Sequence, residues 1–267
     1  MLWKACYGAK IQNKYELRIV IRIFFVPLHT TMIPKIIHLC WFSNDPYPVE
    51  IKVCLDSWKR LLAYFVVRLW DYDAAKAIGI PFIDEALENR KWAFAADVVR
   101  FYAVWKYGGV YMDSDIFLFR RFDELLDKND FITTAEAGEG MTWWGLQAAF
   151  FMGVAGNKFC EEMVEYYRNR KFVKEDGSFD QTISPHLMVP TAEKMGYKFD
   201  DTKVQHLEGL TVLPTRYLSP QKKWKHDKEA IGVHRVYGSW KKKKLGRKID
   251  IWVHHVWHVI RYALFKR

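Results

Sequence analysis

Two aspartates, Asp113 and Asp115, stand one residue apart directly after a short apolar stretch, and their type and spacing suit metal chemistry. In extended backbone, side chains two residues apart project to the same side, so both carboxylates would face one point. One or two carboxylates suffice for Mg²⁺ or Mn²⁺, which completes its shell with water and substrate phosphates. A solvated turn is the alternative, but the preceding apolar strand and Gly108-Gly109 favour a metal site that assists a departing diphosphate.

A second charged pair, Asp97 and Arg100, lies on a predicted helix over Lys91–Tyr107. Residues three apart share a helix face, so the two side chains would lie together. They either form a structural ion pair, worth about 0.2–0.5 kcal/mol, or hydrogen-bond the hydroxyls or phosphate of a bound donor. Because the flanking residues make this helix mostly apolar, we expect the pair to bind the donor.

Short apolar runs alternate with helical periods along the chain, which is typical of an α/β fold. A strand over Val110–Met112 would deliver both aspartates to the carboxyl end of the sheet, where open α/β folds bind ligands. Gly108 would supply a left-handed cap to the preceding helix. Further strands are expected at Ile33–Trp41, Val66–Asp71, Phe131–Ala137, Gln147–Val154, Leu210–Leu213 and Ile231–Val236, and further helices at Val49–Leu62, Asn157–Arg170, Pro185–Met195 and Ile249–Phe265.

The composition fits one α/β domain with a large core. Half of the 267 residues are hydrophobic, and the 12 Trp and 14 Tyr fit a carbohydrate or nucleotide site as well as an ordinary core. No run of about 18 apolar residues occurs, so no spanning helix is expected. The four cysteines show no metal-like spacing, which indicates reduced thiols in a cytosolic compartment: Cys6, Cys40, Cys54 and Cys160.

The net charge of +10 is concentrated near the C-terminus. Residues 221–267 carry 14 Lys/Arg against three Asp/Glu, whereas residues 1–220 carry 27 basic and 28 acidic groups. The run Lys241–Lys244 precedes the amphipathic, Trp-containing segment Ile249–Phe265, and this pattern indicates an anionic membrane surface. A nucleic-acid partner is not expected, because a protein that binds nucleic acid would carry its basic residues on a folded face, with aromatic residues between them. The alternative for the tail is a basic helix that is solvated or packed on the body.

These features predict three parts of the chain. Residues 1–31 are expected to be an appendage, either a membrane-leaning leader or a misassigned translation start. The apolar stretch Leu17–Leu28 is broken by Arg18 and Arg22, and no small-residue cleavage site follows it, so a secretory signal is disfavoured. Residues 32–240 would form the α/β domain, and residues 241–267 a basic amphipathic membrane-associating tail.

Three ordered motifs resemble the bacterial members of glycosyltransferase family 32, which are DXD-containing sugar transferases of surface-polysaccharide type with a GT-A fold. They are IPKIIHLCWF from Ile33, AADVVRFYAVWKYGGVYMDSD ending at Asp115, and VHRVYGSW ending at Trp240. The resemblance implies a single domain with a mixed central sheet flanked by helices. It further implies retaining transfer of a sugar from a nucleotide-sugar, such as a UDP-sugar, with Mn²⁺ or Mg²⁺. The basic tail adds the expectation that the enzyme works in the cytoplasm at the inner face of the membrane, where a glycan or lipid-linked oligosaccharide is the acceptor.

The same resemblance implies roles for single residues. Trp41 would stack on the base, and Asp97 and Arg100 would contact the donor. Asp113 would touch ribose and metal, and Asp115 would be the main metal ligand. His234, Ser239 and Trp240 of the last motif would close over the diphosphate. His234 would also be a metal ligand. A core role for Trp41 and a structural role for His234 stay open, and His38 is expected to be structural.

The chain also departs from the family pattern. Arg235 stands where relatives often carry a second His, and it could still face the diphosphate. Ala148 occupies the place of a usual Asn, with Gln147 adjacent, so the side chain that reads the donor sugar is left open. Ser184 replaces a Gly in the stretch Thr182–Pro185. The loop Glu136–Gly145, with Trp143 and Trp144, is a candidate acceptor site.

Two other readings compete with a sugar transferase. Haloacid-dehalogenase-like phosphatases also place Asp-x-Asp after an apolar strand, with the first Asp as nucleophile. They usually have that strand near the start of the domain and carry Thr or Val where Phe117 stands here. A non-enzymatic module that binds membrane or nucleic acid would explain Lys241–Lys244 but leaves both aspartates without a purpose.

Overall fold

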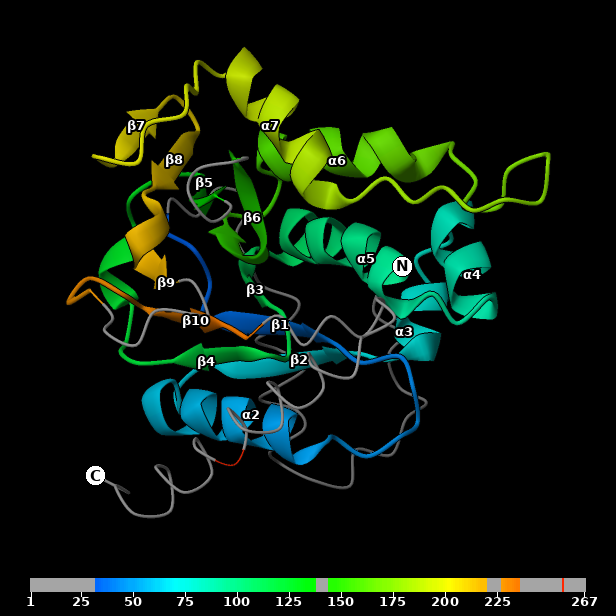
Figure 1. Cartoon of the computed structure of the whole chain (residues 1–267), viewed down its shortest axis with the longest axis horizontal. Coiled ribbons are helices and arrows are strands. Elements are labelled where there is room, and N and C mark those ends of the chain that lie inside the picture. The colour runs from blue at the N-terminus through cyan, green and yellow to red at the C-terminus, as the bar shows by residue number, and fades with distance from the viewer. Residues whose placement is uncertain (1–31, 138–143, 220–226, 236–255, 257–267) are drawn as a thin grey trace, which may run out of the picture. The chain divides into compact units, whose positions relative to one another are not determined.

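The fold is described from a computed structural model, which places residues 32–137, 144–219, 227–235 and Val256 (Figure 1). The expected appendage of residues 1–31 and the predicted C-terminal helix, apart from Val256, lie outside the described residues. Among the described residues, none forms a helix both long enough and apolar enough to cross a membrane. The three cysteines in the described part of the chain are free thiols: Cys40, Cys54 and Cys160.

A seven-stranded mixed sheet forms the centre, in the order β2-β1-β3-β6-β5-β8-β7. Strands β1, β2 and β3 are parallel to one another, and β5 is parallel to β8, whereas β6 is antiparallel to both β3 and β5. Strand β7 is antiparallel to β8. The strands are β1 (Ile36–Cys40), β2 (Val66–Trp70), β3 (Gly109–Met112), β5 (Phe131–Ala137), β6 (Trp144–Gly153), β7 (Gln205–Leu207) and β8 (Leu210–Leu213).

A second, three-stranded sheet joins distant parts of the sequence. Strand β4 (Ile116–Leu118) pairs antiparallel with β10 (Gly232–His234), and β10 pairs parallel with β9 (Leu218–Ser219). Helix α2 fixes β4 through two hydrogen bonds: Trp58 Nε1 donates to the Ile116 carbonyl over 2.7 Å, and the Leu118 N–H donates to Ser57 Oγ over 3.0 Å. This small sheet therefore starts directly after the predicted metal-binding aspartates.

Helices cover both faces of the central sheet (Figure 1). Helices α4 to α7 lie on one face, and α2 lies on the other together with β4. Asn157 caps α6 by accepting a hydrogen bond from the Cys160 N–H, and Asp71 caps α3 in the same way from Ala74. The helices are α2 (Val49–Leu61), α3 (Tyr72–Lys76), α4 (Pro81–Glu88), α5 (Trp92–Tyr107), α6 (Lys158–Arg168) and α7 (Ser184–Lys194).

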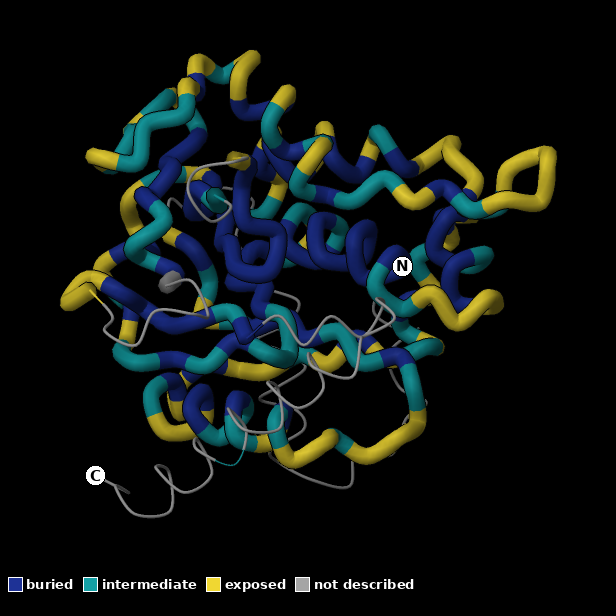
Figure 2. The backbone as a smooth tube through the Cα atoms, viewed as in Figure 1, coloured by how far each residue is buried: buried dark blue, intermediate teal, exposed yellow. Residues whose placement is uncertain are grey.

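The central sheet separates two apolar cores, one on each of its faces. The alternation along β6 shows the division, because Phe151 packs with α5 and α6 while Phe150 and Met152 pack toward α2 and β4. Helix α5 and the middle strands are largely buried (Figure 2). We refer to these sides as the α5 face and the α2 face.

The Gly108-Gly109 turn brings the end of α5 tightly onto β1. Gly109 has φ +114°, and a Cβ there would stand 2.6 Å from the Ile36 carbonyl oxygen. Gly108 has φ +62°, as expected for a glycine cap, but its ψ of 177° lies outside the left-handed helical region. The His38 side chain of β1 contacts this turn, with Nε2 2.8 Å from the Gly108 carbonyl oxygen, and the ring is fully buried. The prediction of a structural role for His38 fits this geometry.

The predicted α/β class with a mixed central sheet and flanking helices, as in GT-A folds, is confirmed. Within the described residues, the predicted strands and helices appear within a few residues of their expected ends, but several elements were not predicted. These are the short helices α3 and α4 and the strands β4, β7 and β9. They have only two to eight residues, too few for a clear apolar period.

Candidate active site at the end of β3

Asp113 and Asp115 lie directly beyond the carboxyl end of β3, as predicted. Their backbone is a turn and not extended: the Ile116 N–H donates to the Asp113 carbonyl over 3.0 Å, and residues 114 and 115 form the turn. The Asp113 N–H donates to the Ala149 carbonyl of β6 over 2.8 Å. The expected extended geometry is therefore wrong, because the chain must reverse here to enter β4. The turn nevertheless brings the two carboxylates together.

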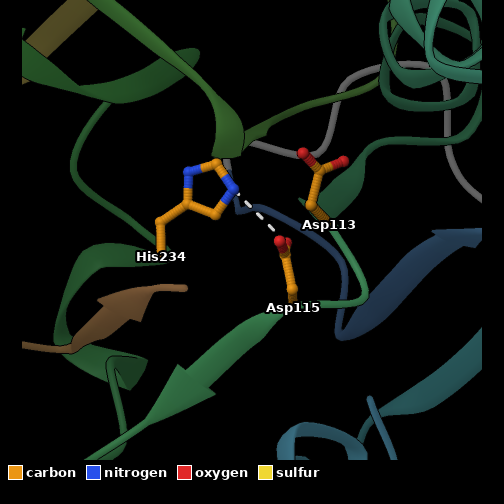
Figure 3. Close-up of side chains that lie close together, drawn as sticks. All are labelled: Asp113, Asp115 and His234. Atoms are coloured by element: carbon orange, nitrogen blue, oxygen red, sulfur yellow. Dashed lines mark ion pairs between the residues drawn. The ribbon is translucent and has the colours of Figure 1, made fainter. Parts of the chain in front are cut away.

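Strand β10 brings His234 to the same place from the far end of the sequence (Figure 3). Its Nε2 lies 3.3 Å from Asp115 Oδ1, and the Arg235 N–H donates to the Asp115 carbonyl over 3.1 Å. The approach depends on Gly232, because a Cβ there would stand 2.5 Å from the Phe117 carbonyl oxygen. One ligand atom from each of Asp113, Asp115 and His234 lies within 4.8 Å of the others.

These three side chains fit a divalent cation. Two carboxylates and one imidazole form a mixed oxygen and nitrogen set, which suits Mn²⁺ better than the all-oxygen preference of Mg²⁺. The Nδ1 atom of His234 is buried and has no hydrogen-bond partner among the described residues. Burial lowers the pKa of His234, but the carboxylates of Asp115, Asp113 and Glu136 outweigh it and raise this pKa to about 9. The surroundings of the ring therefore favour positive charge, and a cation would compete with the proton for it.

Asp113 is held by two neighbours on the α5 face. Tyr111 Oη donates to Asp113 Oδ1 over 2.6 Å, and Arg100 Nη2 lies 3.7 Å from the same oxygen. Burial and the Asp113 carboxylate keep the pKa of Tyr111 well above its usual range, although Arg100 opposes them. Tyr111 therefore stays a neutral donor, and it fixes one oxygen of Asp113.

Asp97 and Arg100 form the predicted pair on α5, and both are buried. Their side chains meet at 3.0 Å between Oδ1 and Nη2. Arg100 also donates to two carbonyls, from Nε to Ala96 over 3.0 Å and from Nη1 to Ala148 over 2.8 Å. Burial lowers the pKa of Arg100, but Tyr111, Asp113 and Asp97 raise it overall, so the guanidinium stays charged.

Asp97 has a second partner that the sequence did not indicate. The Ser184 N–H at the start of α7 lies 3.3 Å from Asp97 Oδ2, so the carboxylate satisfies one of the free N–H groups of that helix. Burial raises the pKa of Asp97, and Arg100 opposes this. Asp97 thus joins α5 to α7 beside the site. Donor contact by Asp97 and Arg100 stays a prediction.

The remaining predicted site residues divide into described and undescribed ones. Trp41 follows β1 and is partly exposed; its Nε1 donates to the Asp45 carbonyl over 2.9 Å, and its ring lies 4.8 Å from that of Tyr47. Base stacking by Trp41 stays a prediction. Ser239 and Trp240 lie outside the described residues, as does Trp143 in the candidate acceptor loop.

Arg235, the departure from the usual second His, is buried against the small sheet. Its guanidinium carbon lies 5.0 Å from the ring centre of Phe117. Its Nε and Nη2 atoms have no hydrogen-bond partner among the described residues. Its backbone holds Asp115, as described above. Contact of this side chain with a diphosphate stays a prediction.

Three residues near the aspartates were not predicted in their observed roles. Tyr111 lies two residues before Asp113 on the same strand, and this spacing was the available signal. Glu136, at the end of β5, interacts electrostatically with His234 and Asp113. Gln147 is hydrogen-bonded to Glu136, whereas the side chain of Ala148 points into the core of the α5 face. No local pattern marked Glu136, because it reaches the site through strand pairing.

Comparison with known proteins points in the same direction. Residues 48–132 match a glycosyltransferase family. Its model is described as "Glycosyltransferase sugar-binding region containing DXD motif", and the matched part, less than half of the chain, includes both aspartates and the Asp97–Arg100 pair. The match supports a glycosyltransferase and does not distinguish family 32 from other families with this motif.

Similarity to a solved structure is low in sequence and partial in coverage. The structure titled "PaToxG Glycosyltransferase" is 14% identical, with a TM-score of 0.45 over 61% of this chain and 70% of that chain. No curated protein matches the sequence.

Proposed function

We propose that this chain is a metal-dependent, retaining glycosyltransferase that takes a sugar from a nucleotide-sugar, first of all a UDP-sugar. One observation carries the proposal. Asp113, Asp115 and His234 offer three ligand atoms within 4.8 Å of one another at the carboxyl end of β3, next to a segment with the DXD sugar-binding signature. Mn²⁺ is the preferred ion, with Mg²⁺ as the second candidate.

The site residues have separate roles in this proposal. Asp113, Asp115 and His234 would hold the cation, which supplies Lewis-acid neutralisation of the departing diphosphate. Tyr111 and Arg100 keep Asp113 in one orientation, and Arg100 is itself fixed by the Ala148 carbonyl. Asp97, on α5 and bonded to the start of α7, would present its carboxylate to donor hydroxyls. Trp41, Ser239 and Trp240 complete the donor site in the proposal, with the base on the Trp41 ring.

Retention of anomeric configuration rests on the family 32 resemblance, and the acceptor rests on this resemblance together with the basic tail. The acceptor would be a glycan or a lipid-linked oligosaccharide in surface polysaccharide synthesis. Product analysis by NMR with a defined acceptor tests the stereochemistry, since an inverted anomeric centre in the product would exclude retention.

The direct test is binding of UDP with and without Mn²⁺ by isothermal titration calorimetry. Asp115→Ala removes one of two carboxylate ligands, so we expect Mn²⁺-dependent UDP affinity to fall at least about 100-fold. The matched control is Asp127→Ala, because Asp127 is exposed in a loop away from the site. Donor hydrolysis should be lost in parallel.

Two results would contradict the proposal. One is unchanged Mn²⁺-linked UDP binding and donor hydrolysis in Asp115→Ala. The other is hydrolysis of simple phosphomonoesters, without hydrolysis of any nucleotide-sugar, by the unsubstituted protein, which would favour the phosphatase alternative.

We also propose that residues 32–240 form the catalytic domain, with residues 1–31 as an appendage, and that residues 241–267 hold it at the cytoplasmic face of the membrane. The support is the sequence of the tail, where each Lys or Arg near an anionic surface contributes about 1 kcal/mol. We expect the full chain to sediment with vesicles rich in phosphatidylserine at physiological salt, and a chain ending at residue 240 to remain in solution with donor hydrolysis intact. Failure of the full chain to sediment would exclude this anchor.

A further inference from the structure

Glu136 places a third carboxylate beside the candidate active site. It is the second-last residue of β5 and pairs with Gly145 of β6, which has no side chain to cover it. Strand alternation directs Glu136 to the α2 face, since its neighbour Ala135 packs on the α5 face. Its carboxylate interacts electrostatically with His234 and Asp113. Because β4 and its partner β10 also lie on the α2 face, Glu136 is on the same side of the sheet as the strands next to Asp115 and His234.

Gln147 connects Glu136 to the metal-binding turn. The Gln147 side chain is hydrogen-bonded to Glu136, and its Oε1 accepts from the Ala149 N–H over 3.0 Å. The Ala149 carbonyl in turn accepts from the Asp113 N–H over 2.8 Å. These contacts link Glu136 on β5, through Gln147 and Ala149 on β6, to the backbone of Asp113.

Glu136 is not part of the metal-ligand group. The three residues whose ligand atoms lie within 4.8 Å of one another are Asp113, Asp115 and His234. A partly buried carboxylate is costly unless its oxygens accept hydrogen bonds, and nearby carboxylates add repulsion. Burial accordingly raises the pKa of Glu136, against the opposing effects of His234 and Gln147. A purely structural role would be served at lower cost by an amide or an apolar side chain.

Resting on the proposed function, we propose that Glu136 hydrogen-bonds hydroxyl groups of the donor sugar and helps to decide which sugar is accepted. When the diphosphate is bound at Asp113 and Asp115, the sugar attached to it offers several hydroxyl groups as hydrogen-bond donors, all on a single ring. A carboxylate accepts two such bonds in fixed directions, with Gln147 holding its orientation.

Specificity of this kind depends on unpaired polar groups. A site built to hydrogen-bond a substrate hydroxyl strongly rejects a substrate that lacks it or carries it in the wrong direction. Changing the carboxylate to an amide keeps the shape but turns one acceptor into a donor. Nucleotide and metal contacts are made elsewhere, so they should survive the change.

The test compares Glu136→Gln with the unsubstituted full chain and with Glu208→Gln, a matched control in the exposed β7–β8 turn. Mn²⁺-dependent binding of UDP is measured by calorimetry. Hydrolysis of UDP-glucose, UDP-galactose and UDP-N-acetylglucosamine is measured as kcat/KM. We expect Glu136→Gln to bind UDP within about twofold of the unsubstituted protein, and to lose at least about tenfold in kcat/KM for the preferred donor. Glu136→Asp should recover part of this loss.

Each other outcome overturns a defined statement. If Glu136→Gln keeps the donor ranking and rates of Glu208→Gln, the role of Glu136 is refuted while the proposed function stands. If it loses Mn²⁺-dependent UDP binding as strongly as Asp115→Ala, Glu136 belongs to the metal or nucleotide site and the sugar role is refuted. If the unsubstituted chain binds no UDP in the presence of Mn²⁺, the proposed function fails and this role fails with it.

Discussion

At the scale of single residues, Asp113 is the most constrained of the proposed ligands. Its Oδ1 receives a hydrogen bond from Tyr111, and the Arg100 guanidinium lies at ion-pair distance from the same oxygen. Arg100 has further partners in Asp97, Ala96 and Ala148, so its position does not depend on Asp113 alone. Because the Tyr111 hydroxyl lies 2.6 Å from Asp113 Oδ1 and Arg100 Nη2 lies 3.7 Å from it, the orientation of the carboxylate depends mainly on Tyr111.

Tyr111→Phe removes that hydroxyl and leaves the buried ring in place. Partners that orient metal ligands typically contribute about 10- to 100-fold to metal affinity. We expect Mn²⁺ affinity, measured by titration in the presence of UDP, to fall by about tenfold.

Tyr166→Phe on α6 provides the matched control, because Tyr166 is partly buried and remote from the aspartates. A variant with Phe at position 111 that binds Mn²⁺ as tightly as this control would show that Arg100 alone is enough to orient Asp113. Thermal unfolding of both variants monitors whether the loss is local.

At the scale of elements, the local part of the site could be predicted from the sequence. Helix α5, the Gly108-Gly109 turn and β3 are continuous in the chain, so the i,i+3 spacing of Asp97 and Arg100 and the position of Asp113 follow from regular geometry. The helix pair meets at 3.0 Å as expected. Two local details differ from the prediction: the ψ angle of Gly108, and the backbone between the two aspartates, which must turn so that the chain can enter β4.

The non-local part of the site could not be predicted from residue patterns. His234 joins the aspartates because β10 pairs with β4, and β4 is only three residues long. A strand of that length has no periodic signal, and the register depends on the close approach at Gly232. The resemblance to family 32 implied His234 nonetheless. Glu136 had no such signal, since it depends on the β5–β6 register, which shifts between Thr133 and Ala135.

At the scale of the whole molecule, His38 on β1 is bonded to β2 and to the end of α5, at the amino end of β3. Trp70 Nε1 of β2 can only donate, so His38 Nδ1 accepts this bond at 3.2 Å, and Nε2 then donates to Gly108 at the end of α5. The ring must therefore be neutral, because a proton on Nδ1 would break the bond to Trp70. Burial lowers the pKa of His38 to about 4, although the bond to Gly108 opposes this.

This shift predicts how the stability of the fold depends on pH. The unfolded chain binds the His38 proton near its ordinary pKa of 6.5, whereas the folded chain does so only near 4. Between these values the unfolded state holds more protons at position 38, so His38 lowers the free energy of unfolding as pH falls from 6.5 to 4. A difference of this size corresponds to about 3 kcal/mol. Urea unfolding at a series of pH values measures the fall.

His38→Gln isolates this contribution, because the Gln amide does not titrate and can still donate to Gly108. We expect the variant to be less stable than the unsubstituted protein at pH 7, and to lose much less stability between pH 6.5 and 4. His186→Gln, at an exposed position on α7, should keep the full slope. Asp123, whose pKa is lowered to about 2 mainly by a hydrogen bond from Arg121, acts below this window, since its stabilisation is lost only as pH falls below its ordinary 3.8. Equal slopes for His38→Gln and the unsubstituted protein would show that other groups cause the acid sensitivity, and that His38 does not tie β1, β2 and α5 together as a neutral ring.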